Sequence, residues 1–289
     1  MANTQGLKQR IRSVKSTRQI TKAMQLVAAS KMRKAQEATK ASSPYTLAAR
    51  ELLAAISTHS SVKDHPLFKT RKVESRLIIL IASDKGLAGA YNSNVIKAYT
   101  NEIQADTKKG ITTKTLTVGR KAAQFVSRVK GIDVLGSYEE LPDRPDGSEL
   151  RAILNTSREL FVNGDVDAVD VVYTDYVTSI TQVATTMRVL PAGFEEGQAP
   201  TKTFDAVYEP STEEVLNGIA YRLVGAQLFQ ALLDSRASEY SMRMIAMKNA
   251  TDNASDLIDD LSLAMNKARQ GAITQELAEI SAGAEALNE

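Results

Sequence analysis

The chain has 289 residues, with no cysteine, no tryptophan and only two histidines, His59 and His65. Without cysteine there is no disulfide framework, no thiolate nucleophile and no thiol redox switch. Two histidines alone do not assemble a usual zinc site. We therefore set aside thiol and metal chemistry, and we expect no bound cofactor.

Long apolar runs are also missing. No stretch approaches the roughly 18 consecutive apolar residues of a membrane span. Hydrophobic residues make up 43% of the chain, charged residues 24%, and the formal net charge is +2, which together predict a soluble intracellular protein. The aromatic content of 5% is low for a globular enzyme but natural for long helices rich in alanine, lysine, glutamate and leucine.

Proline is absent from residue 211 to the end, where apolar residues recur in steps of three and four. Sustained over this length, the pattern predicts one long helix with a coiled-coil seam. At about 1.5 Å per residue, a helix from Ser211 to near Ala286 measures roughly 110 Å. The seam comprises Met244, Met247, Thr251, Ala254, Leu257 or Ile258, Leu261, Met265 and Ala268.

Residues 2–57 read as a second long helix, of about 80 Å, in which Pro44 is the one interruption. An apolar stripe on an isolated helix is unstable in water. The stripes of the two long helices are therefore expected to pack against each other, which predicts an antiparallel pair. The C-terminal helix should then extend past its partner by roughly 30 Å. The expected N-terminal stripe comprises Leu7, Ile11, Val14, Ile20, Met24, Val27, Ala28, Met32 and Ala35.

The middle of the chain alternates strand and helix patterns. A continuous apolar run at residues 76–83 indicates a strand covered on both faces. We expect further strands at 112–118, 168–178 and 182–190, the last two as an antiparallel hairpin, and helices at 91–107, 120–130 and 148–162. The predicted fold is α/β: a long antiparallel coiled coil of N- and C-terminal helices (1–71 and 209–289) plus a central Rossmann-like α/β domain (72–208).

The turn after the first strand lies where phosphate-binding loops occur. Its two glycines, Gly86 and Gly89, stand three apart, without the G-x-G-x-x-G or Walker spacing, so we favour a tight strand-to-helix turn over nucleotide binding. Asp84 and Lys85 remain open as a partner contact. There is also no G-x-S-x-G elbow and no H-E-x-x-H helix. We expect no active site in this chain.

Charge is distributed unevenly. Residues 1–40 hold ten lysines and arginines against the single acid Glu37, whereas residues 241–289 hold four basic and eight acidic residues. Solvated faces and attraction between the paired helices explain this best, although exposed pairs contribute under ~1 kcal/mol each. Nucleic-acid binding is disfavoured because no aromatic platform accompanies the basic residues. A mitochondrial presequence is disfavoured because the helical pattern continues past residue 40.

Four motifs in order along the whole chain carry a family resemblance: ITKAMQLVAASKM (20–32), SDKGL (83–87), ASE (237–239) with Arg243 and MKNATDN (247–253), and ITQELAEI (273–280). Together with the two-helix layout, they resemble the gamma subunit of F-type ATP synthases. The absence of cysteine departs from the regulatory dithiol of chloroplast forms, and the start at Met1 without a presequence favours a bacterial form.

The resemblance implies a rotating shaft inside a ring of three alpha and three beta subunits. The α/β domain would form the foot, with the epsilon subunit, on a membrane ring of c subunits. Proton flow would turn the shaft and drive ATP synthesis at the beta subunits, or run in reverse. The chain would then be a peripheral protein on the cytoplasmic side of a cell membrane, with no nucleic-acid partner.

The resemblance also implies residue roles. Met24 and Arg243 match shaft positions that face the moving lever of beta, with a plain seam residue as the alternative for Met24. A polar set matches positions that meet the catch loop of beta, and two foot positions match contacts to the c-ring, with a simple linker as their alternative. The polar set is Arg269, Gln270 and Thr274; the foot positions are Tyr208 and Glu209.

The last dozen residues are rich in alanine, serine and glycine. Small side chains suit a shaft tip that turns in an apolar sleeve, because deep interlocking would add a barrier at each step. A frayed terminus is the alternative. For the whole chain, the alternatives to a rotary shaft are a stationary scaffold, a coiled-coil rod with an α/β head, and a nucleotide-dependent enzyme that uses the central domain.

Overall fold

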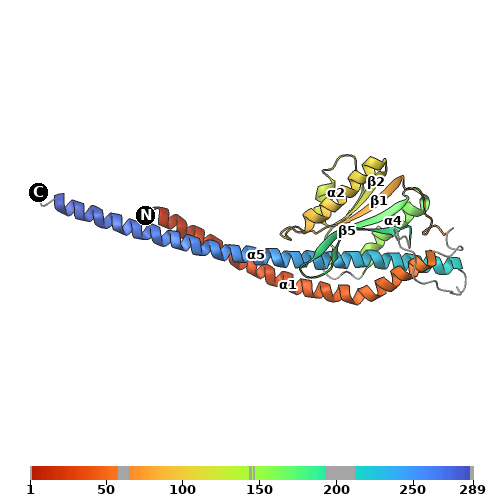
Figure 1. Cartoon of the computed structure of the whole chain (residues 1–289), viewed down its shortest axis with the longest axis horizontal. Helices are drawn as coiled ribbons and strands as arrows, with labels where there is room; N and C mark the ends of the chain where they lie inside the picture. The colour runs from red at the N-terminus through yellow and green to blue at the C-terminus, as the bar shows by residue number, and fades with distance from the viewer. Residues whose placement is uncertain (1, 58–64, 143–144, 146, 193–211, 287–289) are drawn as a thin grey trace. The chain divides into compact units, whose positions relative to one another are not determined.

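The computed structural model describes residues 2–57, 65–142, 145, 147–192 and 212–286. It has a long helix at each end of the chain and a mixed sheet between them, as the sequence predicts (Figure 1). The elements in order are α1 (Ala2–Ser57), β1 (Ser75–Ile81), α2 (Tyr91–Lys109), β2 (Thr112–Val118), α3 (Arg120–Val126), β3 (Asp133–Tyr138), the 3₁₀ turn η2 (Ser148–Leu150), α4 (Arg151–Asn163), β4 (Ala168–Tyr176), β5 (Gln182–Leu190) and α5 (Thr212–Ala286).

The five strands form one sheet in the order β3-β2-β1-β4-β5. Strands β1, β2, β3 and β4 are parallel to one another. Strand β5 runs antiparallel to β4, which confirms the predicted hairpin. Ile79 of the central strand β1 pairs with Leu116 on one side and Val171 on the other. This order and the crossover helices give the predicted Rossmann-like arrangement.

The two faces of β1 enter two different hydrophobic cores. Leu77, Ile79 and Ile81 pack in the larger core with side chains of α1, α4 and α5. Ile78 and Leu80 pack on the opposite face with side chains of α2 and α3. A strand buried on both faces has no polar alternation, which is why it appears as one apolar run.

Strand β3 was not predicted. It lies at the edge of the sheet, and most of its residues are exposed or half-buried, so it has no apolar run to identify it. Gly136 sits in its middle because a Cβ there would approach the Leu116 side chain to 3.2 Å. Helix α3 ends at Val126, four residues before the predicted end.

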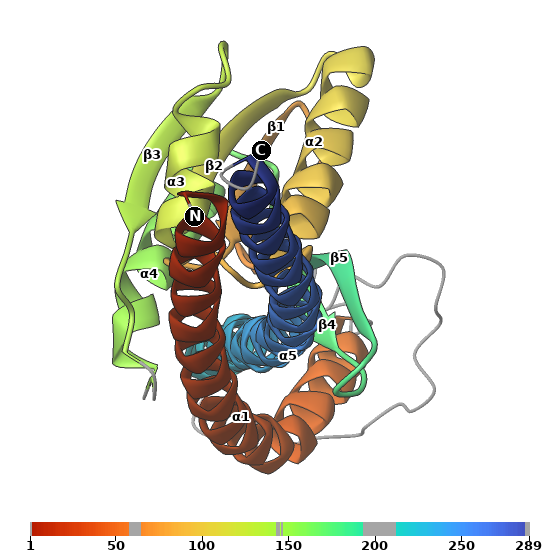
Figure 2. The ribbon, with the colours of Figure 1, turned by 90° about the vertical axis from the view of Figure 1, so that its left-hand side faces the viewer.

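The structure divides into two compact units, which are described separately: the coiled-coil unit, residues 1–28 and 243–289, and the body unit, residues 29–242. In the coiled-coil unit α1 and α5 lie side by side, with the start of α1 and the end of α5 at the same end (Figures 1 and 2). The predicted antiparallel pairing is therefore confirmed.

The less exposed positions of both helices in the coiled-coil unit recur in alternating steps of three and four, the heptad repeat of a left-handed coiled coil. On α1 they include Thr4, Leu7, Ile11, Val14, Arg18, Thr21, Gln25 and Ala28; on α5 they include Met247, Thr251, Ala254, Ile258, Leu261, Met265, Ala268 and Ala272.

Three residues of the predicted N-terminal stripe, Ile20, Met24 and Val27, lie outside the seam positions. Ile20 is 58% exposed and Val27 is 57% exposed. The heptad that passes through Ile11 and Val14 continues to Arg18 and Thr21, so Ile20 falls between seam positions. On α5 the seam takes Ile258 and leaves Leu257 exposed.

In the body unit α5 is buried on most sides from residue 220 to residue 241. It packs in the larger core with Ala49 and Leu53 of α1 and with residues of α4 and the sheet. Gly225 allows a close approach, because a Cβ there would lie 3.1 Å from Leu154. A helix surrounded in this way has no single apolar stripe.

Candidate functional site

The end of α5 extends beyond α1 within the coiled-coil unit. The hydroxyl oxygens of Thr21 and Thr251 lie 2.9 Å apart, which sets the register of the antiparallel pair. Counting nineteen residues back along α1 and forward along α5 places Ala2 opposite Gln270. The remainder of α5, to Ala286, is about 24 Å long, slightly less than the expected 30 Å.

Large apolar side chains line this extension. Ile273, Leu277 and Ile280 are 50%, 60% and 69% exposed, and their steps of four and three place them on one face of the helix. An exposed apolar stripe of this kind marks an interaction surface. The motif ITQELAEI contains all three residues, and the spacing of three and four that predicts the seam also predicts this stripe.

The polar set predicted to contact a partner lies at the start of the extension. Arg269, Gln270 and Thr274 are all exposed. The Thr274 hydroxyl donates a 3.0 Å hydrogen bond to the Gln270 carbonyl oxygen of its own helix. The structure thus brings these three residues together beside the start of α1, next to the apolar stripe.

The other predicted contacts differ in exposure. Met24 is half-buried and Arg243 is 9% exposed, and by the register they lie within about two helical turns of each other. The neighbouring Leu26 and Val27 are more exposed than either; neither was predicted as a partner contact, and Val27 was expected in the seam. Tyr208 and Glu209 lie outside the described residues.

The two helices of the coiled-coil unit present opposite charges to solvent. On α1 the exposed basic residues are Lys8, Arg10, Arg12, Lys15 and Lys22; on α5 residues 252–260 expose Asp252, Asp256, Asp259 and Asp260 and no basic residue, with Lys248, Lys267 and Arg269 on either side of this stretch. The potential around this unit therefore changes sign from one side to the other. A partner that encircles it meets a different surface on each side.

In the body unit, α5 occupies the place where Rossmann-like folds bind ligands, outside the carboxyl ends of the parallel strands. Leu232, Ser235, Arg236 and Glu239 line this crevice and leave a cavity of about 10 Å³. Arg236 donates a 2.8 Å hydrogen bond to the Leu141 carbonyl oxygen across it. Such a cavity holds one water molecule at most.

The turn after β1 is held by contacts within the protein. One oxygen of the Asp84 carboxylate accepts hydrogen bonds from the backbone N–H groups of Arg120 and Glu140, both at 3.1 Å. Gly119 is required beside it, because a Cβ there would lie 2.1 Å from the Ala82 carbonyl oxygen. Asp84 therefore links the segments that follow β1, β2 and β3, which supports the interpretation of this segment as a tight turn.

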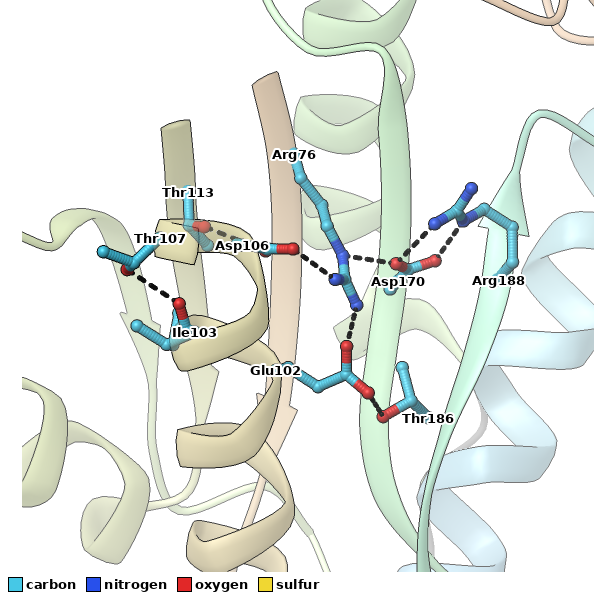
Figure 3. A network of polar contacts seen from close by, with 9 residues as sticks. All are labelled: Arg76, Glu102, Ile103, Asp106, Thr107, Thr113, Asp170, Thr186 and Arg188. Atoms are coloured by element: carbon cyan, nitrogen blue, oxygen red, sulfur yellow. Dashed lines mark hydrogen bonds and ion pairs between the residues drawn. The ribbon is translucent and has the colours of Figure 1, made fainter. Parts of the chain in front are cut away.

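A buried ion network joins α2 to three strands (Figure 3). Arg76 of β1 lies 2.7 Å from Glu102, 2.9 Å from Asp106 and 2.5 Å from Asp170. Arg188 of β5 pairs with the same Asp170 at 2.5 Å. Burial alone would lower the pKa of Arg76, but the carboxylates of Asp170, Glu102 and Asp106 together raise it. The network holds a charged guanidinium inside the fold.

Among the described residues, no group of three or more potential ligands could hold a metal ion. His65 is buried, packs edge-on against Phe68, and its Nδ1 accepts a hydrogen bond from the Leu67 N–H. His59 lies outside the described residues.

None of the described helices combines the length and the apolar character that a membrane span requires.

Comparison with known proteins gives consistent results along the full chain. A family model described as ATP synthase matches residues 3–287. The chain is 38% identical over 292 residues to a protein named ATP synthase gamma chain from Cupriavidus necator, covering 99% of this chain and 100% of the relative. It is 39% identical to the protein of the same name from Opitutus terrae, covering 98% of each.

Two solved structures have a similar fold. The rotational state 3 structure of the Euglena gracilis mitochondrial ATP synthase, described as OSCP/F1/c-ring, aligns with a TM-score of 0.70 and 18% identity, over 99% of this chain and 95% of that one. The central stalk/c-ring structure of the Tetrahymena thermophila mitochondrial ATP synthase aligns with a TM-score of 0.62 and 26% identity, over 80% and 99%.

Proposed function

The chain belongs to the family of ATP synthase gamma chains, and we propose that it is the central rotary shaft of such an enzyme. The observation that carries the proposal is the end of α5, which extends past α1 with Ile273, Leu277 and Ile280 exposed. The chain itself leaves this apolar stripe exposed to water. The stripe is stabilised when another protein covers it.

The asymmetry of the coiled-coil unit supports a rotary role. The unit has a basic side on α1 and an acidic side on α5, and it changes from two helices to one near Gln270. In a ring of three equivalent beta subunits, each subunit faces a different side of this shaft. Contacts that differ between sites bias each site toward a different conformation, so rotation changes nucleotide affinity at each site in turn.

In this proposal the chain takes part in no bond making. The Rossmann-like crevice is occupied by Leu232, Arg236 and Glu239 of α5, so catalysis is assigned to remote sites on beta. We expect the purified chain alone to bind no ATP and to have no ATPase activity. Saturable, stoichiometric ATP binding would contradict this assignment.

The finer partner assignment follows the family. We propose that the coiled-coil unit turns inside a ring of three alpha and three beta subunits, and that the α/β domain contacts epsilon and the c-ring. Association with the cytoplasmic side of a cell membrane would then be peripheral and would depend on the complex. Coupling of proton translocation to ATP synthesis, or to hydrolysis in reverse, follows from the same proposal.

Affinity purification from membranes tests the proposal. A tag on this chain should recover alpha, beta and epsilon with gamma in a 3:3:1:1 ratio, together with ATPase activity that the chain alone lacks. Recovery of a stable complex without alpha and beta would instead favour the stationary scaffold.

A further inference from the structure

Three elements of the body unit meet at one buried carboxyl group. Asp234 of α5 is 7% exposed and faces Thr39 of α1 as well as Tyr173 and Asp175 of β4. Its carboxyl oxygen accepts a hydrogen bond from the Gln230 side-chain amide one turn earlier, at 2.9 Å. The carboxyl thus sits where α5, α1 and the end of β4 come together.

Next to Asp234, α5 completes the hydrogen bonding of β4. Strand β1 pairs with β4 only as far as Val172, so the backbone of Thr174 has no β1 partner. The Ser235 hydroxyl accepts from the Thr174 N–H at 3.3 Å, and the Ser238 hydroxyl donates to the Thr174 carbonyl oxygen at 3.4 Å. The attachment of α5 to the sheet therefore passes directly beside the Asp234 carboxyl.

Two buried polar atoms at this junction, Thr174 Oγ1 and Gln230 Oε1, have no hydrogen-bond partner within the described residues. Amide and hydroxyl oxygens accept hydrogen bonds, whereas an ionised carboxylate has no hydrogen to donate. A protonated Asp234 can donate one to the side-chain oxygen of Gln230. The proton would therefore satisfy an acceptor that the ionised form leaves unpaired.

The charges around Asp234 also favour its neutral form. Asp175 on β4 is a second acid facing the same site, and the phenol of Tyr173 lies close enough to be influenced by both acids. Arg50 of α1 lowers the pKa of this Tyr173. Lys31 of α1 lies over the Tyr240 ring of α5 at 5.6 Å. An ionised Asp234 would thus sit buried beside a like charge.

We propose that Asp234 is a proton-operated latch, which ties α5 and α1 to the end of β4 while its carboxyl is neutral and weakens that junction when the carboxyl ionises. The latch concerns local opening of the body unit and goes beyond the shaft function. Any effect of the latch on torque transmission rests on the shaft function, whereas the latch itself does not.

The direction of the pH effect follows from linkage. Burial, with Asp175 as a smaller cause, raises the pKa of Asp234 from 3.8 to about 7, against the opposing hydrogen bonds of Gln230 and Thr39. A group with a raised pKa contributes stability that is complete below its unfolded value and is lost as the pH rises through its folded value. The junction should therefore open more readily as the pH rises from about 4 to about 7, and should change little above that.

Hydrogen–deuterium exchange of the chain in its assembled complex tests the latch. Wild type and Asp234→Asn are compared at pH 5.5, 7.0 and 8.5 through peptides that cover residues 172–176 and 230–238, with α4 peptides as the internal reference for intrinsic exchange. The asparagine keeps the shape of the neutral acid. The ratio of wild-type to variant exchange should rise roughly tenfold from pH 5.5 to 7.0 and then level off.

Two further variants make the test specific. Asp175→Asn removes the facing like charge, so the rise should be smaller. Glu159→Gln removes an exposed carboxylate of α4 and should behave as wild type. A wild-type to Asp234→Asn ratio that is constant from pH 5.5 to 8.5 would overturn the latch. If Asp234→Asn does not assemble, wild type is compared with Asp175→Asn instead. An equal rise of exchange from pH 5.5 to 7.0 in both proteins would overturn the latch. None of these outcomes depends on rotation, so this experiment tests the latch and the shaft function is tested separately.

Discussion

The hydroxyl oxygens of Thr21 and Thr251, 230 residues apart in the chain, lie 2.9 Å apart across the seam of the coiled-coil unit. Each also lies within hydrogen-bonding distance of a carbonyl oxygen of its own helix, that of Arg18 at 3.1 Å and that of Met247 at 2.8 Å. Polar pairs at seam positions specify register, because any slip separates them and buries each against an apolar neighbour.

Replacement of Thr21 or Thr251 by valine should therefore lower the free energy of unfolding by about 0.5–1 kcal/mol each, because a hydroxyl loses its partner across the seam. The double valine variant should recover most of that loss. A double-mutant cycle on the purified chain, from urea unfolding followed by circular dichroism, measures the coupling. Thr17→Val, which removes an exposed hydroxyl, is the matched control. Additive effects of the two substitutions would show that the pair does not set the register.

The buried ion network predicts a larger effect. Arg76→Met leaves Glu102, Asp106 and Asp170 without their shared guanidinium, so the free energy of unfolding should fall by about 3–5 kcal/mol. Lys72→Met breaks an exposed pair with Glu74 and should change it by less than ~1 kcal/mol. Urea unfolding of the two variants compares them. Equal, small effects would mean that the network contributes little to stability.

Met24 tests the lever contact of the shaft. A lysine there adds a charge to a half-buried position beside the seam, which must be desolvated or paired in some rotary positions and not in others, a difference of about 1–3 kcal/mol. Proton pumping per ATP hydrolysed in membrane vesicles should fall more than assembly does. Met24→Leu keeps the volume and should pump normally. Normal pumping by the lysine variant at normal hydrolysis would remove Met24 from the functional residues.

Two truncations separate the tip of α5 from the polar set below it. Deletion of residues 279–289 keeps Gln270, Thr274 and two of the three stripe residues, so the complex should assemble and turn with reduced stability or rate. Deletion of residues 270–289 removes all of them and should lower both assembly and ATP synthesis strongly. Assembly yield and gradient-driven ATP synthesis in vesicles give the comparison. Loss of synthesis by an assembled short-deletion complex would show that the extreme tip carries torque.

The local sequence pattern was sufficient to predict the large elements of this protein. The three-and-four spacing of apolar residues near both ends predicts two long helices that bury each other, because an isolated stripe is unstable in water. The unbroken apolar run of β1 predicts a strand covered on both faces. The extension of the C-terminal helix past its partner also follows from helix lengths, whereas the choice of Arg269, Gln270 and Thr274 on it came from the family resemblance.

What only the tertiary structure decided depends on residues far apart in the chain. Strand β3 is held as a strand by its pairing with β2, not by a pattern of its own. The crevice of the sheet is filled by Arg236 and Glu239 of α5, which no spacing within α5 indicates. The pKa of Asp234 is raised because residues of other elements bury its carboxyl, with Asp175 of β4 as a smaller cause. Periodicity reports which face of a helix is buried; it does not report which distant side chain is buried against it.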